Sequence, residues 1–150
     1  MTSFLMFIAT GGFSGYLPKA PGTWGSLVGL ALFLLLGRLE LSLYLAVVAT
    51  LLVAGFFAAG SAEKILDKKD PGVVVIDEIV GMLITLTGAP LTWPFLLAGF
   101  LCFRFFDILK PFPVRWAERS FNGGVGIMLD DVLAGLYGLA CLWVLRLLLG

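Results

Sequence analysis

Twenty consecutive residues without a charge, Leu43 to Ala62, constrain this chain more than any other feature. That length matches the roughly 20 apolar residues that a helix needs to cross the hydrocarbon core of a bilayer. A second stretch, Val132 to Leu149, contains Arg146 as its only charge. Hydrophobic residues make up 60% of the 150 residues and charged residues 13%, whereas a soluble domain has about 25% charged residues. These features exclude a cytosolic enzyme and a disordered chain, and they predict an integral membrane protein.

The charged residues restrict the chemistry further. Ten Lys and Arg balance ten Asp and Glu, so there is no basic excess to bind nucleic acid. Histidine is absent, so no imidazole can serve as a base, a nucleophile or a metal ligand. Cys102 and Cys141 both lie inside apolar runs and are interpreted as small buried hydrophobic residues. Any metal ion would therefore be held by oxygen atoms, which favours Mg²⁺.

The apolar segments predict an all-α, polytopic membrane helix bundle of about five transmembrane spans, formed by residues 1–150 as a single domain. The spans are expected at residues 24–39, 43–62, 76–89, 93–109 and 132–149. Pro90 and Pro94 interrupt the long stretch from Ile76 to Lys110, which predicts a tight hairpin there. A single broken, re-entrant helix is the alternative, and it leaves four spans or five open.

With five spans, the basic residues separate between the two sides of the membrane. Eight fall on one side, and Arg38 and Arg146 on the other. The positive-inside rule then places the N-terminus in the cytoplasm and the C-terminus outside it. Nine of the ten carboxylates fall on the same cytoplasmic side, at about head-group depth: Glu63, Asp67, Asp70, Asp77, Glu78, Asp107, Glu118, Asp130 and Asp131.

Two acidic pairs stand out because each is expected to open an apolar helix. Asp77-Glu78 precedes one predicted span, and Asp130-Asp131 precedes the last. An acidic residue at a helix start can simply cap the helix, but capping accounts for one acid of each pair more readily than for two. Together with Asp107, the two pairs form a candidate oxygen cage for one or two Mg²⁺ ions.

Arg104 lies among phenylalanines in the segment that also contains Asp107 and Lys110. A guanidinium suits bidentate binding of phosphate, so Arg104 and Lys110 are candidate phosphate ligands. The alternative is a local ion pair between Arg104 and Asp107, three residues apart on one helix face, with a lysine whose amine reaches toward the membrane surface.

Two glycine-bearing segments are further candidates. Residues 16–26 predict a turn that leads into a helix start, where the Thr23 and Ser26 hydroxyls and free N–H groups favour an anion. A merely capped helix is the alternative. Residues 122–126 predict a flexible turn, which either closes over a ligand or is only a loop.

Four motifs together resemble the phosphatidylglycerophosphatase A family. They are Pro-Gly-Thr-Trp-Gly-Ser at 21–26, Asp-Glu-Ile-Val-Gly-Met at 77–82, the segment from Phe103 to Arg115, and the segment from Asn122 to Gly135. The resemblance implies a magnesium-dependent lipid phosphatase of the bacterial inner membrane. It would hydrolyse phosphatidylglycerophosphate to phosphatidylglycerol and phosphate. The motifs include Arg115 and Asn122, which the resemblance adds to the expected substrate-binding residues.

The expected mechanism is in-line attack on a phosphomonoester by metal-activated water. Five carboxylates would hold Mg²⁺ and one of them would act as base: Asp77, Glu78, Asp107, Asp130 and Asp131. Arg104 and Lys110 would bind the phosphate oxygens at the cytoplasmic head-group level. The expected partners are the lipid substrate and the membrane, with no nucleic acid; the number of metal ions, a covalent aspartyl-phosphate and the oligomeric state stay open.

Two other functions use similar residues. A lipid phosphotransferase would use the same cage with an alcohol in place of water. A cation transporter would also need acidic residues within the membrane, but deep within spans and on both sides of the midplane. The one-sided carboxylates and Arg104, which would repel a cation, favour phosphate chemistry.

Overall fold

The structure, a computed structural model, describes all 150 residues and contains helices but no strand. The all-α prediction is therefore confirmed. The elements are α1 (Thr2–Ala9), the 3₁₀ helix η1 (Ser14–Tyr16), α2 (Pro21–Leu36), α3 (Leu41–Ile65), α4 (Ile76–Thr85), α5 (Trp93–Leu109), α6 (Val114–Ser120) and α7 (Gly123–Leu149).

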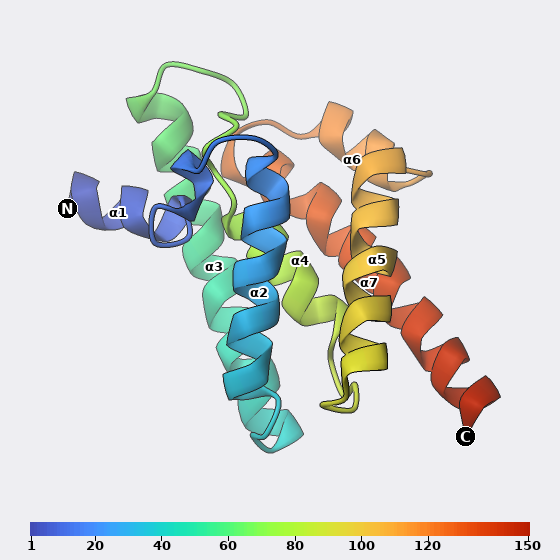
Figure 1. The fold of residues 1–150 in the computed structure, drawn as a ribbon. Helices are drawn as coiled ribbons and strands as arrows, with labels where there is room; N and C mark the ends of the chain where they lie inside the picture. The colour runs from blue at the N-terminus through green and yellow to red at the C-terminus, as the bar shows by residue number, and fades with distance from the viewer.

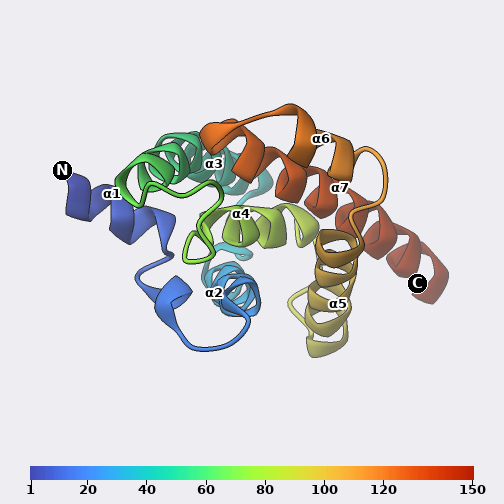
Figure 2. The ribbon, with the colours of Figure 1, turned by 90° about the horizontal axis from the view of Figure 1, so that it is seen from above.

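The short helix α4 occupies the centre of the bundle. Viewed from above, α2 and α5 lie on one side of it and α3 and α7 on the other (Figure 2). The connections α2–α3 and α4–α5 and the C-terminus lie at one end of the bundle, and α6 lies at the opposite end (Figure 1). The hairpin predicted around Pro90 and Pro94 corresponds to the loop between α4 and α5, which contains Pro90 and begins after Thr85.

Only two helices, α3 and α7, are long and apolar enough to cross a membrane by themselves, so the prediction of about five spans is not confirmed. The helix α4 has ten residues, which span about 15 Å of a hydrocarbon core about 30 Å thick. The predicted span at residues 76–89 is therefore helical only as far as Thr85, and the chain enters α4 through the non-helical residues 72–75. Two of the remaining helices, α2 and α5, have 16 and 17 residues.

The predicted boundaries of two helices were wrong. The turn expected at Pro21-Gly22-Thr23 is the first turn of α2, with Pro21 in the position where its missing N–H removes no hydrogen bond. The turn expected at residues 122–126 is the start of α7, which begins at Gly123 rather than near Val132. Asp130 and Asp131 therefore lie in the third turn of α7 and do not open it.

The distribution of polar residues is the reverse of that in a soluble bundle. Large apolar side chains such as Phe57, Val144 and Leu147 are exposed on α3 and α7, whereas Asp77, Asp130 and Asp131 are buried. Contiguous apolar surface on this scale requires a covering partner or a lipid environment.

Glycines allow α4 and α7 to approach closely. A Cβ atom added at Gly135 would lie 2.6 Å from the carbonyl oxygen of Gly81, and one added at Gly81 would lie 2.8 Å from the carbonyl oxygen of Asp131. On the other side of α4, the Tyr44 hydroxyl of α3 donates a hydrogen bond to the carbonyl of Leu83. These contacts fix the position of α4 and of the acidic residues in its first turn.

We expect Gly135→Ala to lower the free energy of unfolding by roughly 1–3 kcal/mol, because the new methyl group overpacks a backbone contact that cannot yield. Thermal unfolding in detergent, followed by circular dichroism, measures the change. The control is Gly72→Ala, since nothing lies within 4 Å of an added Cβ there. Equal stability of the two variants would contradict the close α4–α7 contact.

Candidate active site

Three carboxylates from two helices converge inside the bundle. Asp77 and Glu78 lie in the first turn of α4, and Asp131 lies on the facing helix α7. One oxygen from each carboxylate lies within 4.8 Å of the others. Three buried oxygens of these residues, Asp77 Oδ1, Glu78 Oε2 and Asp131 Oδ2, have no hydrogen-bond partner. We call these three residues the carboxylate cluster.

Helix capping does not explain the cluster. The N-cap residue of α4 is Val75, and no side chain caps the helix. Asp131 lies in the third turn of α7, beyond the free N–H groups of the helix start. Buried carboxylate oxygens without partners are costly, and oxygen atoms are the ligands that hard cations such as Mg²⁺ prefer. The cluster therefore fits a divalent cation.

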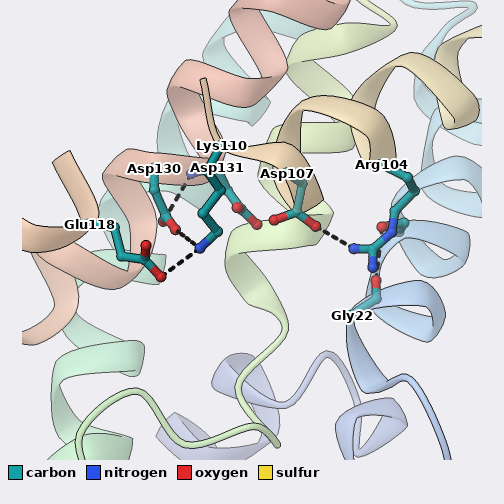
Figure 3. Close-up of polar contacts among 8 residues, drawn as sticks. Gly22, Arg104, Asp107, Lys110, Glu118, Asp130 and Asp131 are labelled. Carbon is teal, nitrogen blue, oxygen red and sulfur yellow. Dashed lines mark hydrogen bonds and ion pairs between the residues drawn. The ribbon is translucent and has the colours of Figure 1, made fainter. Parts of the chain in front are cut away.

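Arg104 lies beside the carboxylate cluster. Its Nη1 donates a hydrogen bond to Asp107 Oδ2, and both side chains are mostly buried. Figure 3 shows the Asp107 carboxylate between Arg104 and Asp131. Asp107 therefore lies next to the cluster, but the guanidinium already compensates its charge.

The start of α2 packs against the site at Arg104 and Glu78. A Cβ atom added at Gly22 would lie 2.7 Å from Glu78 Oε1 and 3.0 Å from Arg104 Nη1. Only a glycine lets the backbone approach these two side chains so closely. No sequence pattern assigned Gly22 a role beyond its place in the turn, because the contact depends on how α2 packs against α4 and α5.

Lys110 forms a second polar group with Glu118 and Asp130. Its Nζ donates to Glu118 Oε1 at 2.7 Å and to Asp130 Oδ2 at 2.9 Å, and Asp130 Oδ1 accepts a hydrogen bond from the Asp131 backbone. Burial alone would lower the pKa of Lys110, but the hydrogen bonds and charges of the two carboxylates outweigh it, so its pKa lies above the usual value. Lys110 thus ties the end of α5 to α6 and α7.

Asp130 also lines a polar cleft of about 500 Å³. Asn122, Glu118 and Asp130 line it together with Glu63 and Asp70. The three residues of the carboxylate cluster do not. The structure thus brings Asp77, Glu78 and Asp131 together, places Asp107 beside them, and turns Asp130 toward Lys110.

The remaining predicted site residues have different positions. The Ser26 hydroxyl is buried and donates to the carbonyl of Gly22, within its own helix. Thr23 lies in the first turn of α2 and is partly buried. Arg115 is exposed on α6 and donates to the carbonyl of Leu109. Glu118 was missed, because its pairing with Lys110 depends on the turn between α5 and α6.

Asp131→Asn should stabilise the protein in the presence of a chelator, by roughly 1–3 kcal/mol. The change removes one of three like charges whose oxygens lie within 4.8 Å of one another. Coulomb's law at an effective dielectric constant near 20 gives about 3 kcal/mol of repulsion for each pair, which screening by salt reduces. Denaturation with and without EDTA measures it, and Glu40→Gln, an exposed acid in the α2–α3 connection, is the control. A loss of stability in Asp131→Asn would show that the carboxylate has a protein partner.

Comparisons with known proteins identify the family of this chain. The family model for phosphatidylglycerophosphatase A matches residues 7–146. Phosphatidylglycerophosphatase A of Haemophilus influenzae is 40% identical over 141 residues, which are 93% of this chain and 86% of the relative. The Escherichia coli protein of the same name is 39% identical over 137 residues, or 91% of this chain and 80% of the relative.

A third relative carries a different description. A "putative phosphatidylinositol-3-phosphatase" of Bacteroides thetaiotaomicron is 42% identical over 158 aligned positions, covering 99% of this chain and 98% of the relative. No solved structure matches the chain significantly. The extent of the family match and the identities over nine-tenths of the chain lead to one conclusion: this protein belongs to the phosphatidylglycerophosphatase A family of phosphoric monoester hydrolases.

Proposed function

We propose that this protein hydrolyses phosphatidylglycerophosphate to phosphatidylglycerol and phosphate, with Mg²⁺ as cofactor, at the cytoplasmic face of the bacterial inner membrane. The observation that carries the proposal is the set of three unpartnered carboxylate oxygens beside Arg104. The names of two relatives supply the substrate.

Asp77, Glu78 and Asp131 would hold the metal ion, and Asp107 lies near enough to contribute. A bound Mg²⁺ supplies positive charge that stabilises the phosphoryl oxygens during the reaction. Three or four carboxylates in a histidine-free site agree with a hard cation and with no softer one.

Arg104 binds and orients the phosphate. Its planar fork offers several donors, of which Nη1 contacts Asp107. Water attacks phosphorus in line with the ester oxygen, and the bond between phosphorus and that oxygen breaks. A carboxylate of the site accepts the proton from the attacking water. The proton removed from the water is returned to the leaving oxygen, so that phosphatidylglycerol departs as the alcohol.

The membrane location is supported by the apolar exterior and by the two long helices α3 and α7. In the proposed topology, α2, α3, α5 and α7 cross the bilayer, and α4 with residues 72–75 completes a fifth passage. The predicted cytoplasmic side is the end that carries α6, where most of the basic residues occur. The lipid phosphate then lies at the depth of Arg104.

A cation transporter is a weaker alternative, because Arg104 borders the cluster and the buried acids gather in one part of the bundle. A phosphotransferase would use the same residues and differs only in the acceptor. The products of the reaction separate these functions.

Purified protein in mixed micelles should release phosphate from phosphatidylglycerophosphate in Mg²⁺ and lose that activity in EDTA. Phosphatidylinositol 3-phosphate and phosphatidate serve as alternative substrates, and colorimetric phosphate with mass spectrometry of the lipid provides the readout. Transfer of phosphate to an added alcohol would indicate the phosphotransferase, and full activity in EDTA would refute the metal site.

We expect Arg104→Lys to lower kcat/KM by roughly a hundredfold, about 3 kcal/mol of transition-state binding, since a point charge cannot supply the two-pronged contact. Unfolding in detergent should change little. The control is Arg38→Lys, an exposed residue in the α2–α3 connection. If Arg104 only neutralises Asp107, the double variant Arg104→Met with Asp107→Leu will stay active, which is the result that returns Arg104 to a structural role.

A further inference from the structure

We propose that a groove between the end of α5 and the outer face of α6 binds the phosphodiester of an anionic phospholipid. The groove has a volume of about 490 Å³, and Phe112, Arg115, Trp116 and Arg119 line it. It lies apart from the carboxylate cluster, whose residues do not contribute to it. The inference rests on the proposed membrane location of the protein.

Two cations of the groove have no acidic partner, although Nη2 of Arg115 donates to the carbonyl of Leu109. Arg115 and Arg119 are exposed, and neither forms an ion pair with an acid. The third cation of the groove, Lys110, is already paired with Glu118 and Asp130. Arg119 also borders the polar cleft that contains Glu118. The two guanidiniums offer planar donors that match phosphate oxygens.

The aromatic residues of the groove indicate a membrane interface. Phe112 is 78% exposed and Trp116 is 52% exposed, although both are large and partly apolar. Tryptophan is enriched at the level of lipid head groups, where its ring contacts acyl chains and its N–H contacts water or phosphate. The opposite face of α6 buries Val114 and Ala117, so Arg115, Trp116 and Arg119 lie on the outer face. Phe112 lies in the connection that precedes α6.

The surface below the groove is apolar. Phe105 and Ile108 of α5 are 56% and 65% exposed, so acyl chains can lie along α5 while the head group contacts α6. Basic residues next to a membrane attract anionic lipids. A phosphodiester of the surrounding bilayer and the phosphodiester of the substrate or product present the same chemistry to the two arginines.

Tryptophan quenching by brominated lipids tests this inference. Trp24, Trp93 and Trp143 are partly exposed, and replacing each by Phe leaves Trp116 as the only tryptophan. The protein is reconstituted into phosphatidylcholine vesicles that contain brominated phosphatidylglycerol, brominated phosphatidylserine or brominated phosphatidylcholine in equal fractions. We expect the anionic lipids to quench Trp116 with an affinity several-fold above that of phosphatidylcholine.

Substitutions of the two arginines test whether they cause the preference for anionic lipids. Arg115→Gln with Arg119→Gln should reduce the anionic preference roughly tenfold or to none. The control, Lys64→Gln with Lys68→Gln, removes two exposed cations at the end of α3 and should retain the preference. Equal quenching by phosphatidylserine and phosphatidylglycerol would identify bilayer lipid as the source, and a preference confined to phosphatidylglycerol would identify the substrate or product.

Three results would overturn the proposal. Equal quenching by neutral and anionic lipids would refute lipid binding in the groove but would not affect the proposed phosphatase function. An equal loss of the preference for anionic lipids in both double variants would show that the overall positive charge of this end of the protein causes it, and not the groove. If no lipid quenches Trp116, the proposed membrane location is also wrong. Failure of the phosphate-release assay, in contrast, would refute the proposed phosphatase function and leave the preference for anionic lipids intact.

Discussion

The burial of three like-charged carboxylates without a protein counter-ion is the constraint on which the rest of this structure depends. Asp77, Glu78 and Asp131 hold unpartnered oxygens inside a bundle whose outside is apolar. Such an arrangement is unfavourable in the isolated chain. A cation that binds only the folded protein offsets this cost by mass action. The stability of the fold and the chemistry of the site are therefore linked through the same three residues.

The central position of α4 follows from small residues on its neighbours. Gly81 and Gly135 let α4 and α7 approach to backbone contact, and Gly22 lets the start of α2 reach Arg104 and Glu78. Of the three glycines, Gly22 is the one that brings charged side chains within reach of another helix. Because α4 is short and enclosed, its first turn lies within the bundle and not at the end of a full span.

Much of this could be predicted from residue patterns, because apolar length and charge distribution act locally. The all-helical fold and the family follow from the long apolar stretches and from four motifs in order. The start of α7 could not be predicted, since Gly123 to Gly126 are typical of a loop, whereas Gly124 packs against the backbone of α3 at Phe56 and Gly60. The partners of the two acids on α7 could not be predicted from the sequence either. Adjacent helix positions differ in direction by about 100°, so Asp130 pairs with Lys110 while Asp131 joins Asp77 and Glu78.

Binding of Mn²⁺ to the purified protein, measured by electron paramagnetic resonance, tests the central claim most directly. The spectrum of free Mn²⁺ should lose amplitude on addition of the native protein, and Asp77→Asn or Asp131→Asn should weaken binding at least about tenfold. Glu63→Gln, in the separate polar cleft, should bind like the native protein. Mn²⁺ that stays free, or binding that depends on Glu63 and not on Asp131, would contradict a cation site at the carboxylate cluster.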